Sequence, residues 1–385
     1  MSGLKMYLGT HLISGEESGC TPPSKPSNAP TYINKGGIHY RMIFEDNFDG
    51  TDINRDVWSS DYRAAYYNPQ YVCASDYWVE DSILNLRVTG DKRTLDSASW
   101  PAAVSGVQSV QSSAPGAKHD FRPFYGFVSQ EGYYELRANM YSGLEATLDG
   151  SHFAWWMTGV DDDNGKNVEY DMIEHFGNAP RVANLNVYAN DDKDIPPSTR
   201  KAYTADFDIG PGWHTWGFLW EQNHLTVWLD EKQIIAMNCT TPNYPMMQWL
   251  TAYRSLGERS GYWAGEYDPN QPDMISQIDY LRIYKKCESI STEPVTVVST
   301  DPINVDIVAG KYTINQTSGR LTAVPLHCYA YWSDGSRTEH IVQYEVLRHD
   351  QIAMLDSGGT FELHGRAMGI GTPITATITV TAAAG

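Results

Sequence analysis

The chain has 385 residues, a length that favours two domains. It carries 28 Lys and Arg against 47 Asp and Glu, and its formal net charge of −19 at pH 7 argues against nucleic acid as a partner. The sequence contains no run of about 18 apolar residues, so we expect no membrane span.

The N-terminal segment MSGLKMYLGTHLISGEESG lacks the apolar core of about 7–15 residues that a secretory signal contains. We therefore expect either that a signal has been removed or that the protein leaves its cell by another route. We therefore expect an extracellular or cell-surface location. The stretch MYLGTHLISG resembles the opening of some phage tail or baseplate proteins, so a phage virion is the alternative location. Residues 19–31 are rich in Pro and Ser and predict an arm or linker, which we assign to residues 1–36.

From about residue 38 the pattern predicts an all-β domain. Polar and apolar residues alternate in ILNLRV (83–88), YYELRANM (133–140) and LTVWLD (225–230), and turn signals such as DG and PG separate such runs. The best candidate for a helical turn is PMMQWLTAYRSLG (245–257). Short strands over residues 37–287 indicate two packed antiparallel sheets, a sandwich or jelly roll.

The pattern breaks near residue 288, where STEPVTVVSTDP predicts a linker. The remaining residues contain several short strands with turns at SDGS and SGG, a spacing that fits an immunoglobulin-like sandwich. This segment, 288–385, also resembles bacterial Ig-like modules through YAYWSDGSRTEHI and the closing ATITVTA strand. Since such modules are usually spacers or adhesion units, we place no catalysis there.

The stretch VEYDMIEHFG (168–177) places Glu169, Asp171 and Glu174 within six positions among apolar residues. In a regular strand Glu169 and Asp171 share one face and Glu174 points to the other. A β-bulge at Met172–Ile173 would return Glu174 to the face of the other two carboxylates. We therefore expect one bulged strand with three carboxylates facing a cleft.

Such crowding of like charges has a chemical use. Retaining glycosidases place two carboxyl groups only about 5–5.5 Å apart, one as nucleophile and one as acid/base. A shorter Asp between two Glu residues can hydrogen-bond one of them and, through its charge, help keep the other protonated.

The segment EYDMIE matches the bulged ExDxxE signature of glycoside hydrolase family 16, and the chain resembles this family over residues 38–286. The resemblance implies a concanavalin-like β-jelly-roll fold and a retaining endo-glycanase, with Glu169 as nucleophile, Asp171 as assisting residue and Glu174 as acid/base. Tyr170 stands where the family usually has an aliphatic residue, and we expect it to face the core. Five further segments resemble the family, and they occur in the order that the family has, three before EYDMIE and two after it. They are MIFEDNFDGTDINRDVW, YGFVSQEGYYELRANM, HFAWWMTG, WHTWGFLWEQNHLTVWLDEKQI and ISQIDYLRIYKK.

The expected activity is hydrolysis of internal β-1,3- or β-1,4-linked bonds of a glucan or galactan by double displacement. The alternative is a non-catalytic glycan-binding or structural surface or virion protein, and the retention of all three carboxylates favours the enzyme. The chemistry requires no cofactor. The resemblance also allows a structural calcium ion on the convex face, with Asp279 as a candidate ligand. The five cysteines are widely spaced without a CxxC motif, so a zinc site is not expected.

Further residues are candidates for substrate binding. Trp155 and Trp156 are adjacent, so one should line the cleft and the other the core, and the resemblance favours Trp156 as a stacking platform. His175 either lies near the cleft or caps the strand. His152 and Asn186 could reach sugar hydroxyls, and the alternative for Asn186 is a polar convex surface. The candidates are Trp156, Trp155, His175, Asn186, Arg63 and Arg254.

Overall fold

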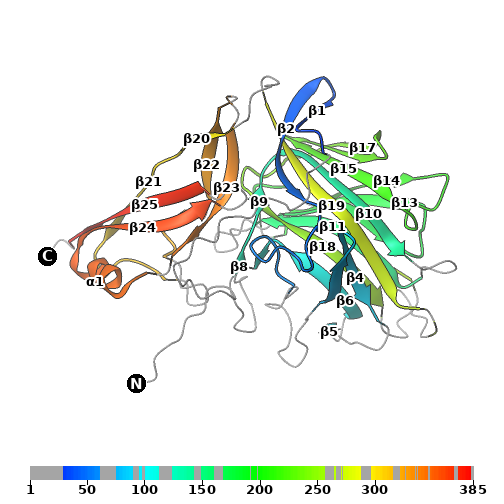
Figure 1. Cartoon of the computed structure of the whole chain (residues 1–385), viewed down its shortest axis with the longest axis horizontal. Helices are drawn as coiled ribbons and strands as arrows, with labels where there is room; N and C mark the ends of the chain where they lie inside the picture. The colour runs from blue at the N-terminus through cyan, green and yellow to red at the C-terminus, as the bar shows by residue number, and fades with distance from the viewer. Residues whose placement is uncertain are drawn as a thin grey trace.

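The computed structural model of the chain has two layers of β-strands followed by a separate group of strands (Figure 1). The structure describes residues 29–60, 75–89, 95–97, 100–111, 124–142, 149–159, 168–190, 192–196, 198–255, 264–265, 270, 272–287, 296–314, 321–325, 327–333, 335, 337–345, 347–367 and 372–382.

The first layer is an antiparallel sheet in which nine described strands pair, and β19 lies at its centre between β2 and β10. Its path runs β1-β2-β19-β10-β15-β16-β17, with β4 also on β19 and β3 on β4. The strand β1 falls within the range that the sequence assigned to the N-terminal arm. The strands are β1 (Tyr32–Lys35), β2 (Ile38–Asp46), β3 (Asp76–Glu80), β4 (Ile83–Val88), β10 (Gly132–Ser142), β15 (His214–Glu221), β16 (His224–Leu229), β17 (Lys232–Asn238) and β19 (Met274–Lys286).

The second layer is also antiparallel, and eight strands of the described ranges form it in the order β14-β13-β12-β11-β18-β6-β5, with β9 on β18. A separate described pair is β7 (Val110–Gln111) with β8 (Phe124–Tyr125). The strands of the second layer are β5 (Leu95–Ser97), β6 (Trp100–Gln108), β9 (Val128–Ser129), β11 (Ser151–Gly159), β12 (Glu169–Phe176), β13 (Val182–Tyr188), β14 (Thr199–Thr204) and β18 (Met246–Ser255).

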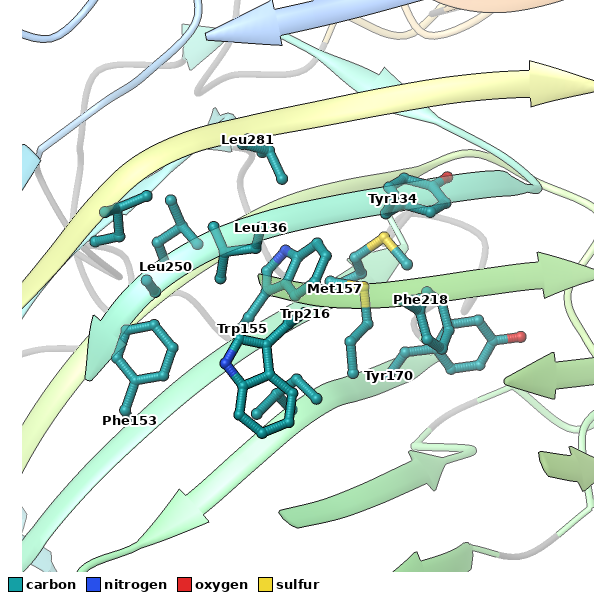
Figure 2. Packing of buried hydrophobic residues seen from close by; sticks show 14 of the residues in the cluster. Tyr134, Leu136, Phe153, Trp155, Met157, Tyr170, Trp216, Phe218, Leu250 and Leu281 are labelled. Atoms are coloured by element: carbon teal, nitrogen blue, oxygen red, sulfur yellow. The ribbon is translucent and has the colours of Figure 1, made fainter. Parts of the chain in front are cut away.

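The hydrophobic core lies between the two sheets and follows from the alternation along each strand. Trp155 of β11 packs in the same cluster as Trp216 of β15, and all of their surface is buried (Figure 2). Tyr170 of β12 also enters this core, as the sequence predicts, and its ring meets Trp220 edge-on at 5.2 Å. Burial of these large rings is the main favourable contribution that holds the layers together.

The structure confirms the prediction of two packed antiparallel sheets, and the alternating segments at 83–88, 133–140 and 225–230 lie in β4, β10 and β16. The prediction of a helical turn within residues 245–257 is wrong, because Met246–Ser255 is strand β18. This strand lies between β11 and β6, and nearly all of its side chains are buried on both faces. Apolar residues therefore occupy both faces of the strand, and the segment lacks the alternation that distinguishes a half-buried strand from a helix.

The C-terminal strands form a sheet path β20-β22-β23-β24-β25-β21 with its own hydrophobic core. The pair β21–β25 is parallel, whereas the other pairs are antiparallel. Membership of the Ig-like class, and the boundary after residue 287, stay predictions. The elements are β20 (Val297–Thr300), β21 (Ile303–Val308), β22 (His327–Trp332), β23 (Arg337–Tyr344), α1 (His349–Ser357), β24 (Gly359–Ala367) and β25 (Thr372–Thr381).

The two groups of strands meet at a cation–π contact, in which the buried guanidinium of Arg41 on β2 lies 4.1 Å from the ring centre of Trp332 on β22. Among the described residues, no helix has the length and apolar character needed to cross a membrane.

Candidate functional site

Strand β12 contains a β-bulge at the position that the sequence predicts. On one side Trp155 pairs with Ile173 while the next residue, Trp156, pairs with Asp171, which leaves Met172 without a partner. On the other side the register slips again between Asp171 and Glu174. Met172 and Ile173 are both fully buried in the core. The bulge therefore lets both apolar residues point inward while the carboxylates on either side share the opposite face.

We call this opposite face of the eight-stranded sheet the site face. Cross-strand partners in an antiparallel sheet share a face, so Asp171 lies in one row with Trp156, Asn186 and Arg200. Glu174 lies in the next row with Ala154 and Asn184, and Glu169 lies beyond Asp171, opposite Thr158 and Tyr188. The fold thus brings Glu169, Asp171 and Glu174 together on one surface.

Asp171 is the most buried of the three carboxyl groups, and only 5% of its surface is exposed. Burial raises the pKa of Asp171 well above its usual range, and the negative charges of Glu169 and Glu174 raise it further. A hydrogen bond with Glu169 acts in the same direction, whereas the amide of Asn186 opposes it. Asp171 therefore keeps a proton readily, and it can donate this proton to the Glu169 carboxylate.

Both oxygens of Glu174 face nitrogen atoms. The Nδ2 of Asn186 donates to Glu174 Oε2 at 2.6 Å and to Asp171 Oδ2 at 3.1 Å. The Nε2 of His152 lies 3.4 Å from Glu174 Oε1. Glu169 has its own amide neighbour, because the Nδ2 of Asn190 lies 3.4 Å from its Oε2. Each outer carboxylate is thus held from a neighbouring strand or loop.

The structure places His175 on the core side of β12. Its ring is fully buried, with Nε2 3.1 Å from the carbonyl oxygen of Pro180 and Nδ1 2.9 Å from the hydroxyl of Tyr141. A carbonyl oxygen only accepts, so Nε2 carries the proton. Burial lowers the pKa of His175 to about 4. With none of its surface exposed, His175 has no contact surface for a sugar in this structure.

The two adjacent tryptophans face opposite ways, as the alternation predicts. Trp155 is fully buried in the core, and its Nε1 donates to Gln248 Oε1 at 3.0 Å (Figure 2). Trp156 lies on the site face, and its Nε1 donates to Thr251 Oγ1 at 3.0 Å. Its ring stacks on Trp249 with centroids 4.7 Å apart and an interplanar angle of 11°. Trp156 is therefore close to the carboxylates and Trp155 is not.

The remaining candidates differ in position. Asn186 lies on the site face but contacts two carboxylates, and its Oδ1 has no hydrogen-bond partner among the described residues. Arg254 is buried at the end of β18, where it donates to the carbonyl oxygen of Pro272 at 2.7 Å. Arg63 lies outside the described residues.

Trp249 lies beside the carboxylates and is not among the predicted residues, whereas His152 is. His152 lies four positions before Trp156 on β11, so strand alternation alone would place both on one face. Trp249 carries no such signal, because the apolar segment around it does not distinguish strand from helix. Only the pairing of β18 with β11 brings Trp249 beside Trp156.

Asp279 has a cationic partner, since Arg137 forms an ion pair with it across the adjacent strands β10 and β19. No cluster of three or more His, Cys, Asp or Glu side chains suited to a metal ion occurs in the described ranges. The described part of the site therefore offers carboxylates, amides, an imidazole and indoles, a set suited to proton transfer and sugar contact.

Comparisons with known proteins find similar glycoside-cleaving enzymes. Residues 105–282 match the sequence model described as Glycosyl hydrolases family 16. A β-glucanase of Acetivibrio thermocellus is 24% identical over 188 residues, which are 48% of this chain and 51% of that protein. The chain thus spans about half the length of the curated relatives it matches.

A solved structure shares the fold over most of the chain. The GlcNAcα1-4Gal-releasing endo-β-galactosidase from Clostridium perfringens aligns over 90% of this chain and 81% of its own, with a TM-score of 0.57 and 18% identity. This likeness is one of fold, and it agrees with the jelly roll that the sequence predicts.

Proposed function

We propose that the chain is a retaining endo-β-glycanase, and the match of residues 105–282 to the model of glycosyl hydrolases family 16 supports this proposal. The chain hydrolyses internal β-1,3- or β-1,4-glycosidic bonds of a glucan or galactan. The observation that carries the proposal is the bulged strand β12, which sets Glu169, Asp171 and Glu174 on one face of the sheet.

The reaction proceeds in two displacements. A carboxylate oxygen of Glu169 attacks the anomeric carbon and forms a glycosyl ester, while Glu174 gives its proton to the departing glycosidic oxygen. Glu174, now a carboxylate, then takes a proton from water. The resulting hydroxide attacks the same carbon, which breaks the ester bond to Glu169 and restores both groups. Two inversions give net retention.

Asp171 orients the nucleophile Glu169 and limits the charge beside it. Its raised pKa supports a proton shared with Glu169, so that the pair carries one negative charge instead of two. The hydrogen bond from Asp171 orients Glu169 and reduces the repulsion that three adjacent carboxylates would otherwise create.

The stacked indoles of Trp156 and Trp249 lie in the same cross-strand row as Asp171 and are 5% and 4% exposed, so only their edges at the site face are offered to the sugar chain. The Oδ1 of Asn186 is buried and its Nδ2 contacts Asp171 and Glu174, so Asn186 serves the carboxylates and not the sugar. No metal or organic cofactor is needed for these steps. A polymeric substrate is consistent with an extracellular or cell-surface location, whereas placement on a phage virion rests on residues 1–28, outside the described ranges.

A reducing-end assay over a polysaccharide panel tests the proposal. The panel contains laminarin, lichenan, agarose, porphyran, carrageenan, arabinogalactan and a glycan with GlcNAcα1-4Gal ends, the group released by the C. perfringens fold relative. Wild type is compared with Glu169→Ala and Glu174→Ala. We expect one glycan to be cleaved by wild type alone, with loss of at least about 10²-fold in each variant. Cleavage that survives both substitutions would move the active site away from β12, and binding without cleavage would favour a lectin.

A further inference from the structure

The acid/base carboxyl of the proposed reaction faces two side-chain nitrogen atoms from two different strands. Asn186 of β13 reaches Glu174 Oε2 at 2.6 Å, and His152 of β11 lies 3.4 Å from Oε1. The amide Nδ2 of Asn186 carries two hydrogens, so it can donate to Glu174 and Asp171 at the same time. If the amide were turned over, its oxygen would face two carboxyl groups, which disfavours that orientation.

Both donors are fixed by their surroundings. Asn186 is 2% exposed and His152 is 3% exposed. The imidazole of His152 stacks between Phe176, at 5.2 Å and 26°, and Tyr253, at 5.1 Å and 18°. Burial lowers the pKa of His152 despite the opposing effect of Glu174, so the ring is neutral near pH 7. Nε2 of this neutral ring faces Glu174 Oε1 at 3.4 Å, within reach of a hydrogen bond from the tautomer protonated at Nε2, and the two aromatic rings hold the imidazole in place.

This arrangement distinguishes the two oxygens of Glu174. An amide NH2 group only donates, so Oε2 must accept from Asn186 and cannot carry a proton pointed along that bond. Because a carbonyl oxygen accepts more strongly than a hydroxyl oxygen, the short bond from Asn186 favours Oε2 as the carbonyl oxygen and Oε1 as the oxygen that carries the transferable proton. The N–H of His152 lies on one side of Oε1, so the hydroxyl must turn away from β11, and the same N–H stabilises Oε1 once the proton has left.

We propose that Asn186 and His152 are positioning residues that fix Oε1 of Glu174 as the proton-donating oxygen. This inference rests on the proposed function. Neither residue transfers the proton. Their effect should therefore appear only when the leaving group needs protonation, because proton transfer to the departing oxygen is the step that they align.

The experiment compares two leaving groups in wild type, Asn186→Ala and His152→Phe. His152→Phe preserves the aromatic stack and removes the N–H. One substrate is the panel polysaccharide that wild type cleaves, and the other is the 2,4-dinitrophenyl β-glycoside of its repeating disaccharide. Dinitrophenolate departs as a stable anion and needs no proton. The value of kcat/KM reports the first displacement for both substrates.

We expect each variant to lose about 10- to 100-fold in kcat/KM on the polysaccharide and less than about threefold on the dinitrophenyl glycoside. Equal losses on both substrates, or no loss on the polysaccharide, would overturn the assignment. Asn85→Ala, a buried amide of the nine-stranded sheet that donates to the Ile83 carbonyl oxygen at 3.1 Å, controls for stability. If Asn186→Ala does not fold, Asn186→Ser and His152→Phe still decide the question. Wild type inactive on both substrates would instead contradict the proposed function itself.

Discussion

Acidification should destabilise the jelly roll through one buried side chain, His175. The neutral ring fits between the Pro180 carbonyl oxygen and the Tyr141 hydroxyl, and burial lowers its pKa from 6.5 to about 4. Nearby His152 acts in the same direction, whereas the charge of Asp208 opposes the shift. Between these two pKa values His175 is protonated in the unfolded chain and neutral in the folded chain. Stability is therefore fully present above about pH 6.5 and falls as the pH drops towards about 4.

The size of the effect follows from the shift. Each pH unit in this window costs about 1.4 kcal/mol, so His175 should remove about 2.5 kcal/mol of unfolding free energy between pH 8 and pH 4.5. Urea unfolding followed by tryptophan fluorescence measures it in the jelly roll, because Trp332 is the only one of 12 tryptophans beyond residue 263.

His175→Gln provides the comparison, since glutamine can keep a donor near the Pro180 carbonyl oxygen but does not titrate. We expect the variant to be less stable than wild type at pH 8 and the difference to shrink by about 2.5 kcal/mol at pH 4.5. His364→Gln, at an exposed position on β24, is the matched control for a histidine substitution outside the jelly roll. If the difference in unfolding free energy between wild type and His175→Gln stayed constant from pH 8 to pH 4.5, His175 would not have the lowered pKa on which the prediction rests.

Three further predictions concern buried polar contacts. Asp171→Asn should raise the unfolding free energy relative to wild type, and this gain should grow as the pH rises above about 4. In that range the unfolded wild type releases a proton that the buried carboxyl, with its raised pKa, keeps in the folded state. Urea titrations at pH 5 and pH 8 would show no such trend if Asp171 were an ordinary acid. Trp332→Ala should cost about 1–2 kcal/mol by removing the ring over Arg41, and calorimetry should then show the two groups of strands unfolding more independently; an unchanged thermogram would contradict this. Thr251→Val should cost about 1–3 kcal/mol because it leaves the Trp156 indole N–H buried without its acceptor, whereas Thr251→Ser should be nearly neutral in the same denaturation assay.

The central part of the site could be predicted because it is local in the chain. Strand alternation gives each residue a face, and the spacing of Glu169, Asp171 and Glu174 requires a bulge if all three are to share one. The same rule separates Trp155 from Trp156. The bulge at Met172–Ile173 and the opposite directions of the two indoles both appear in the structure.

The surroundings of the carboxylates depend on which strands become neighbours, and periodicity contains no such information. Trp156 and Thr251 are 95 residues apart in sequence, yet they form a hydrogen bond because β18 pairs with β11. His152 approaches Glu174 only because Phe176 and Tyr253, from two different strands, hold its ring. The sequence by itself determined the two-layered all-β architecture and the acidic strand, since both arise from local patterning. The tertiary structure alone decided which donors and rings surround that strand, because long-range strand pairing sets those distances.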